Sequence, residues 1–448
     1  MRILQRNAIL WAQVTRFLSF LWLITLASLA LEAQVVAQGG SADPVFSQVP
    51  FDQWLSQADQ SHMRWSVRIS EPQLSTHQRL VSGIDIEVDG AELAKRRGKG
   101  QFLVLVRVTD DQGRVWQNHQ EMDLEGIEDG MKANEAVFSQ LVFLLPGDYH
   151  VAIAIFDDAT GEHSVIKRRL HVSPLKNEPL PGAWRELPAV EFIPAYTTPP
   201  DGWYLPSIEG KLRLTVETHE PVHVNLVVNL TPSEEFTGST RVQNRNFGLL
   251  LPATKVLSQV DWGNTVFSLA LLDLSRRRVT YQQESTPGPR DNAHLLDWSK
   301  AGSSLAEVKP GIIDVRSLEK RQFGAEFFLD EIRRRIGASH GPGPRRTPVL
   351  IVLSGPVRFE SGQELHPIAL DSPTDAKVFY IRYHPAPRIA PGRSGGRYQR
   401  GDLRADYGPQ FDQLEPLLKP LEPRLFEVGT PQQFRKALAA ILTEVAKL

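Results

Sequence analysis

Residues 222 to 233 read Val-His-Val-Asn-Leu-Val-Val-Asn-Leu-Thr-Pro-Ser, and this stretch decides how the C-terminal half of the chain folds. The part up to Leu230 is nearly all apolar, which predicts a strand that is buried on both faces. Thr231, Pro232 and Ser233 then end the strand, because proline cannot donate to a ladder and hydroxyl groups bond to nearby backbone. Such a strand needs a packed layer above it and another below it.

Strand and helix patterns alternate around that stretch. We expect strands at 212–218, 266–272, 312–315, 349–353 and 378–383, with a further strand at 278–282 returning beside 266–272, and helices at 247–260, 317–336 and 431–448. Because parallel strands are joined by crossover helices, this alternation predicts an α/β layer with a central, mostly parallel sheet. The clearest helix is the one at 317–336, whose apolar residues recur at near-helical spacing.

The order of these elements resembles the von Willebrand factor A domain family over about residues 211–448. Four segments carry the resemblance, at 227–233, 261–269, 347–355 and 426–434. The resemblance implies a Rossmann-like domain that presents the ends of its strands to a partner. The whole chain is similar to the von Willebrand A-related proteins that some bacteria export.

Members of that family hold a divalent cation with an Asp-x-Ser-x-Ser loop, a later Thr and a later Asp. At the matching positions this chain carries Asn229, Thr231 and Ser233, and Ser354 stands where the later acidic residue is expected. The resemblance therefore implies a degenerate metal set, because neutral oxygens stabilise Mg²⁺ or Mn²⁺ less than carboxylates do. We therefore expect no cofactor. The alternative to a degenerate metal set is that these residues only cap and turn the end of the strand.

The N-terminal half carries short alternating runs between residues 62 and 173. Seven such runs are separated by turn residues such as Pro146-Gly147 and the stretch from Asp157 to Gly161. Alternation with one buried face predicts strands, and seven strands over this length predict an immunoglobulin-like β-sandwich. A hairpin-rich unit of some other β fold is the alternative.

The first residues have the layout of an export signal. Arg2, Arg6 and Arg16 precede an apolar stretch at 17–31, and the small residues Ala33 and Ala37 follow it. We therefore expect a signal peptide at 1–37, which is either cleaved or kept as an anchor, and a secreted or periplasmic protein. No later apolar stretch is long enough to cross a bilayer, so we expect no membrane span after cleavage.

The remaining boundaries follow from composition. We expect a linker at 38–61, the sandwich at 62–173, a Pro-rich linker at 174–207 and the von Willebrand factor A-like domain at 208–448. Eight prolines between 173 and 207 exclude regular helix or a central strand there. Because Trp184, Phe192 and Trp203 lie among them, we expect this segment to pack along a domain surface.

Composition and motifs narrow the function. The formal net charge is −2, so the chain has no overall positive charge that would attract nucleic acid. The absence of cysteine excludes disulfides and thiol chemistry. The sequence contains no familiar hydrolase, metalloprotease or nucleotide-binding motif. We therefore predict a non-enzymatic, exported, protein-binding or assembly module. A structural scaffold and a metal-dependent adhesion protein are the alternatives.

Overall fold

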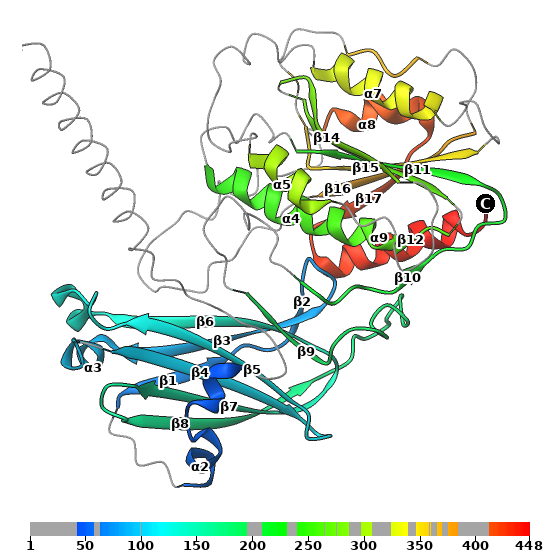
Figure 1. Cartoon of the computed structure of the whole chain (residues 1–448). Coiled ribbons are helices and arrows are strands. Elements are labelled where there is room, and N and C mark those ends of the chain that lie inside the picture. Colours follow the sequence, from blue (N-terminus) through cyan, green and yellow to red (C-terminus); the bar gives the residue numbers. More distant parts are fainter. Residues whose placement is uncertain are drawn as a thin grey trace, which may run out of the picture.

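The computed structural model describes most of the chain from residue 43 onward. The described residues are 43–57, 63–98, 100–194, 208–230, 240–263, 265–274, 276–285, 297–306, 324–338, 346–357, 359, 365–369, 375–383 and 412–448. They form an N-terminal unit of stacked sheets and a C-terminal unit in which helices flank one sheet (Figure 1). The predicted signal peptide, 1–37, lies outside the described residues.

Two antiparallel sheets form the N-terminal unit. The first sheet has the order β1 (Trp65–Ile69), β3 (Leu80–Asp89), β6 (Glu135–Leu144) and β9 (Val190–Ile193), with β2 (Gln73–Leu74) beside β3. The second sheet has the order β5 (Val115–Asp123), β4 (Gln101–Asp110), β7 (Gly147–Asp157) and β8 (His163–Val172). Short helices α3 (Gly90–Lys95) and η2 (Asp129–Ala133) lie in the connections.

The core of this unit lies between the two sheets. Burial alternates along β3, so Ile84 and Ile86 point inward from one sheet to meet Val104 and Ile153 of the other. At the start of β7, the buried Tyr149 donates its hydroxyl hydrogen to the carbonyl oxygen of Leu145, 2.9 Å away. The period-two pattern read from the sequence therefore reports which side of each strand is buried.

Residues 43–57 do not form the free linker that we expected over 38–61. They form η1 (Pro44–Ser47) and α2 (Phe51–Ser56), which pack on the outer face of the second sheet. Phe46, Phe51 and Trp54 are buried there. The physical reason is that these aromatic side chains cover apolar residues of β4 and β7 that would otherwise face water.

The C-terminal unit is built on a six-stranded mixed sheet. Its order is β14 (Arg278–Ser285), β13 (Val266–Asp273), β11 (Val222–Asn229), β15 (Thr347–Ser354), β16 (Lys377–Tyr383) and β17 (Arg424–Val428). The pairings from β13 to β17 are parallel, and β14 runs antiparallel to β13. A two-stranded sheet, β10 (Leu214–Thr215) with β12 (Val260–Asp261), lies beside it.

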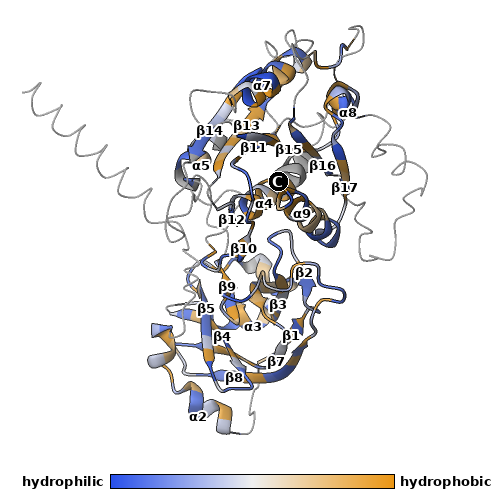
Figure 2. Ribbon diagram, turned by 90° about the vertical axis from the view of Figure 1, so that its right-hand side faces the viewer, coloured by the Kyte–Doolittle hydropathy of each residue, from blue (hydrophilic) through white to orange (hydrophobic). Residues whose placement is uncertain are grey.

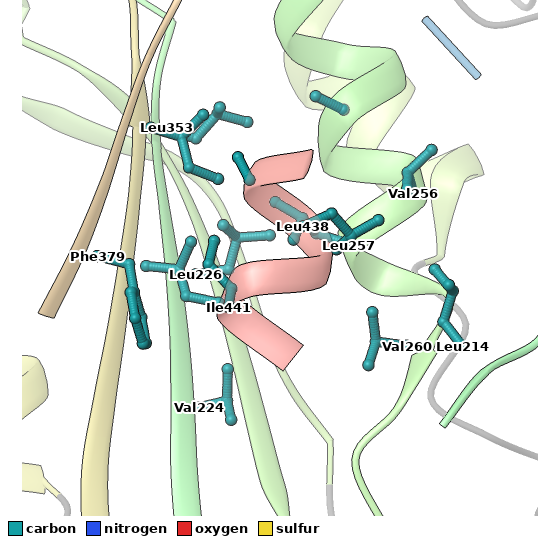
Figure 3. Packing of buried hydrophobic residues seen from close by; sticks show 14 of the residues in the cluster. Leu214, Val224, Leu226, Val256, Leu257, Val260, Leu353, Phe379, Leu438 and Ile441 are labelled. Atoms are coloured by element: carbon teal, nitrogen blue, oxygen red, sulfur yellow. The ribbon is translucent and has the colours of Figure 1, made fainter. Parts of the chain in front are cut away.

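Helices cover both faces of this sheet (Figures 1 and 2). On one face lie α4 (Thr240–Ser258) and α9 (Pro431–Val445), and on the other lie α7 (Gly324–Ala338) and α8 (Leu414–Leu418), which continues into η7 (Lys419–Leu421). The helix α5 (Trp298–Ala306) contacts β14. Figure 3 shows Leu438 and Ile441 of α9 beside Leu226 of β11. Within the described residues, no helix is both long enough and apolar enough to cross a membrane.

The predicted fold class is wrong. We expected an immunoglobulin-like β-sandwich followed by a Rossmann-like, von Willebrand A-like α/β domain with a central, mostly parallel sheet. The described part of the chain consists mostly of antiparallel and mixed sheets, with 41% of its residues in strands and 25% in helices. In the C-terminal sheet, the short connection from Asp273 to Arg278 cannot hold a crossover helix, so β14 must return antiparallel to β13. The strands predicted at 266–272 and 278–282 correspond to β13 and β14, but their antiparallel pairing makes the sheet mixed, which the predicted fold class did not include.

The Pro-rich segment is tied to both units. Ala183 and Leu187 are buried in the core of the C-terminal unit, whereas Val190 and Phe192 belong to β9 and are buried in the N-terminal unit. Its described part ends at residue 194, and residues 195–207 lie outside the described residues. The segment therefore joins the two cores instead of spanning open solvent.

Candidate functional site

The structure brings two of the predicted site residues together. Asn229 is the last residue of β11 and Ser354 is the last residue of the neighbouring β15. Both side chains are fully buried, and the Nδ2 of Asn229 donates to the Oγ of Ser354 over 2.9 Å. Thr231 and Ser233 lie outside the described residues. We call the carboxyl ends of β11, β15 and β16 the carboxyl edge.

The two described members of the predicted metal set are engaged with each other. The Ser354 hydroxyl accepts from Asn229 and donates its one hydrogen to the carbonyl oxygen of Gly355, 2.6 Å away. Neither residue brings a negative charge, which a hard cation such as Mg²⁺ or Mn²⁺ favours in its ligands. Over the ranges given for the described chain, no three Asp, Glu or His side chains gather as an ion site. A degenerate metal set at Asn229, Thr231, Ser233 and Ser354 thus stays a prediction.

A buried ionic network lies beside this pair on β16. Arg382 is in register with Ser354, and only 3% of its side chain is exposed. Its Nη1 donates to Asp412 over 2.9 Å and to Glu415 over 2.8 Å, and its Nε donates to Glu427 over 3.1 Å. A second bond joins its Nη2 to Glu427. One guanidinium thus holds three carboxylates from different segments at the carboxyl edge.

Asp412 is the most enclosed of those carboxylates. Its side chain is fully buried and also accepts from the backbone N–H groups of Val357 and Leu414 and from the Tyr380 hydroxyl, at 3.1, 3.2 and 2.9 Å. These bonds fix the segment after β15 to the start of α8.

The same contacts shift the pKa values of the neighbouring groups. Burial, together with the Asp412 carboxylate, raises the pKa of Tyr380 well above its usual range. Burial alone would lower the pKa of Arg382, but its hydrogen bonds to Glu427 and Asp412 outweigh that effect and raise it. Tyr380 and Arg382 therefore keep their protons at any physiological pH. Neither Tyr380 nor Arg382 is therefore suited to transfer a proton, and both act by positioning the groups that they contact.

A second buried arginine connects the two units. Arg435 of α9 has 3% of its side chain exposed, and its Nε donates to both oxygens of Glu178, at 2.8 and 2.9 Å. Its guanidinium also lies over the ring of Trp184, 4.8 Å from the centroid. Glu178 and Trp184 belong to the Pro-rich segment. We call the contacts among Gln78, Glu178, Trp184 and Arg435 the joint.

Gln78 completes the joint from the turn between β2 and β3. It is fully buried and has a left-handed backbone, with φ of 60°, which is uncommon for a residue other than glycine. Its carbonyl oxygen accepts from Trp184 Nε1 over 2.8 Å and from Arg435 Nη1 over 3.3 Å, and its Nε2 donates to the carbonyl oxygen of Pro431 over 3.1 Å. The contacts across the units hold this turn in a costly conformation.

Charged groups next to the joint are also buried. Arg79, which follows Gln78, pairs with Glu191 of β9. Burial, followed by the charges of Lys255 and Arg79, lowers the pKa of His77 to about 3. His77 is therefore neutral at physiological pH, and its ring packs edge-on against Phe143, with centroids 5.9 Å apart. The surroundings of His77, next to the joint, therefore favour the uncharged form of its ring.

Sequence reasoning missed both arginines. Arg382 is a single charge inside the otherwise apolar run 378–383, and a charge in a buried strand signals a paired partner. Arg435 shares one side of its helix with Leu438 and Leu442, so it lies on the face that packs inward. Neither pattern shows which carboxylates the arginines meet.

Comparison with known proteins adds little. No protein-family model matches the chain, and no curated protein sequence matches it. Among solved structures, the structural genomics target SoR45 matches with 14% identity and a TM-score of 0.15, over 27% of this chain and 96% of that chain. A glycosyl hydrolase family 2 member from Bacteroides cellulosilyticus matches with 10% identity and a TM-score of 0.18, over 72% of this chain and 42% of that chain. Likenesses at such TM-scores carry no weight for fold or function.

Proposed function

We propose that the chain is an exported, non-enzymatic protein that binds or assembles other proteins while holding its two units in one fixed arrangement. The observation that carries this proposal is the joint, in which Arg435 of the last helix is buried against Glu178 and Trp184. Separating the units would leave that charge without its partner, which is costly for a buried ion pair. A fixed joint suits a protein that presents surfaces at a set distance from each other.

The carboxyl edge is the surface that we expect to receive the partner. Open sheets with parallel strands receive ligands at the carboxyl ends of those strands. The buried side chains there are occupied with each other, since Asn229 bonds Ser354 and Arg382 holds Asp412. That arrangement favours a preformed surface over reactive chemistry. Glu415 and Glu427, with 48% and 43% of their side chains exposed, form the outer part of this surface.

Site-specific photo-crosslinking tests the binding face. A benzophenone amino acid at Glu415 or Glu427 should give one defined crosslinked protein in the cells that express the chain. The matched control is the same label at Asp148 in the N-terminal unit, which is 76% exposed and far along the chain from the edge. Equal crosslinking from all three positions, or none from any, would count against a partner at the carboxyl edge.

A structural scaffold without a binding face is the second candidate, and the joint favours it equally. The first candidate assigns partner binding to the carboxyl edge and the second does not. Both candidates require a rigid joint. Limited proteolysis tests the shared part, because buried and hydrogen-bonded backbone resists cleavage. The described part of the Pro-rich segment, up to residue 194, should stay intact under conditions that cut exposed loops. Early cleavage there would exclude both forms of the proposal.

A further inference from the structure

The N-terminal strap, residues 43–57, crosses the outer face of the second sheet of the N-terminal unit from one edge strand to the other. At its start, the backbone N–H of Asp43 donates to Gln117 of β5 over 3.3 Å. Near its end, Trp54 stacks on His163 of β8, with ring centroids 4.4 Å apart, and the carbonyl oxygen of Leu55 accepts from Lys167. The helix α2 lies against β8 at the foot of the molecule (Figure 1).

The strap covers an apolar surface. Phe46, Phe51 and Trp54 form one buried cluster with residues from β4 and β7, namely Leu103, Leu105 and Ala154. Arg107 of β4 reinforces the middle of the strap, since its guanidinium lies 4.5 Å from the Phe51 ring centroid and pairs with Asp52. Without the strap, Leu103 and Leu105 would face water.

A single imidazole ties the first residue of the strap to the sheet. His119 of β5 has 5% of its side chain exposed, and its Nδ1 lies 2.5 Å from Oδ2 of Asp43, whose side chain is fully buried. Its Nε2 lies 3.2 Å from Glu121 of the same strand. Asp43 and Glu121 are the charged groups that act on His119. Arg107 on the neighbouring strand pairs with Asp52.

We propose that His119 is a proton-dependent latch: its protonated ring bridges Asp43 and Glu121 and keeps the strap on the sheet, and loss of that proton releases the strap. A protonated ring donates from both nitrogens, so each carboxylate receives a hydrogen. A neutral ring donates only once and leaves one of the two carboxylates, Asp43 or the partly exposed Glu121, facing a lone pair. Release would uncover Leu103 and Leu105. This inference concerns the N-terminal unit alone and goes beyond the proposed function.

The sign of the pH dependence follows from the direction of the pKa. Burial acts to lower the pKa of His119, but the hydrogen bond to Asp43 and the charges of Asp43 and Glu121 outweigh it, so the pKa lies above its ordinary 6.5. A raised pKa in the docked state means that the latch is fully formed below pH 6.5 and is lost as the pH rises through the raised value. The strap therefore opens on the alkaline side.

Distance measurement between two spin labels tests the latch. The chain has no cysteine, so Gln48→Cys on the strap and Arg169→Cys on β8 place both labels uniquely in the full chain. Pulsed electron spin resonance should give one narrow distance at pH 6 and a broader, longer distribution at pH 9. Circular dichroism at both pH values verifies that the sheets stay folded. An identical narrow distribution at pH 6 and pH 9 would overturn the proposal.

Two variants separate His119 from other titrating groups. In His119→Gln the difference between the two pH values should vanish, because the bridging group no longer titrates. His163→Gln is the matched control, since His163 also touches the strap through Trp54, and the difference should persist in that variant. A pH difference that survives in His119→Gln, or that disappears only in His163→Gln, would contradict the latch.

Discussion

The carboxyl edge and the joint each bury one arginine, and the two surroundings differ in a useful way. Arg382 meets three carboxylates, all within the C-terminal unit. Arg435 meets one carboxylate, the Trp184 ring and a backbone carbonyl, and those partners lie in the Pro-rich segment and the N-terminal unit. The first arrangement shapes a surface of one unit, and the second fixes two units to each other.

The comparison shows that burial alone does not tell what a charge does. Both guanidinium groups are 3% exposed, yet one is surrounded by excess negative charge and the other has a single anionic partner. Removing Arg382 should therefore damage stability most, whereas removing Arg435 should mainly change how the units are placed.

Arg382→Met should have the largest effect on stability. It leaves Asp412, whose side chain is fully buried, without its cation, so we expect the free energy of unfolding to fall by about 3–5 kcal/mol. Urea denaturation followed by circular dichroism measures this loss. Arg424→Met is the matched control on the neighbouring β17: its side chain is 50% exposed, so water screens its pair with Glu444 and the loss should be much smaller. Similar losses in both variants would remove the distinction.

Arg435→Met should weaken the joint more than either unit. Glu178 has 19% of its side chain exposed and regains water, so we expect a loss of about 2 kcal/mol, typical of bonds to a charged group. Small-angle X-ray scattering should show a larger and more variable separation of the two units. Unchanged scattering would mean that the units are held by other contacts.

Ser354→Ala should have a smaller, local effect at the carboxyl edge. It leaves the fully buried Asn229 amide without the acceptor that it has in Ser354, at a cost of about 1–2 kcal/mol. Thermal unfolding measures the loss. Ser258→Ala is the control, because that buried hydroxyl only donates to the Lys255 carbonyl oxygen of its own helix. We also expect Mg²⁺ to leave the melting temperature of the wild-type chain unchanged; a rise that Ser354→Ala abolishes would revive a metal site.

Mild acid should give the smallest effect, and it acts on His77, next to the joint. The pKa of His77 is lowered to about 3, so the folded state resists protonation while the unfolded state takes up a proton below its ordinary 6.5. Stability from this group is therefore complete above pH 6.5 and declines as the pH falls, by about 1 kcal/mol at pH 6. Comparing the stability of wild type and His77→Phe between pH 7.5 and pH 6 measures it. Equal pH slopes in the two proteins would show that His77 is not responsible.

The sequence alone located most strands and the terminal helix. The strand predicted up to Leu230 is observed as β11, ending at Asn229, and the helix predicted at 431–448 is observed as α9. Thr430 caps α9 with a hydrogen bond to the N–H of Gln433, a local pattern that needs no distant partner. Such features depend on neighbouring residues, so periodicity and turn chemistry report them.

Periodicity and turn chemistry could not predict which strands and segments pair with each other. The expected class was wrong because strand direction depends on which strands meet, and the β13 to β14 return is antiparallel. The strap was expected to be a linker because its few aromatic residues show no repeating pattern until β4 and β7 lie beneath them. Among the predicted site residues, only the contact of Asn229 with Ser354 lies within the described chain.

The sequence by itself determined where apolar runs begin and end, and that neither cysteine chemistry nor a familiar catalytic motif is present. Only the tertiary structure decided that Arg435 meets Glu178, 257 positions away along the chain, and that His119 meets Asp43. The physical reason is that burial patterns arise from local periodicity, whereas the partner of a buried charge is chosen by the packing of segments that the chain brings together only on folding.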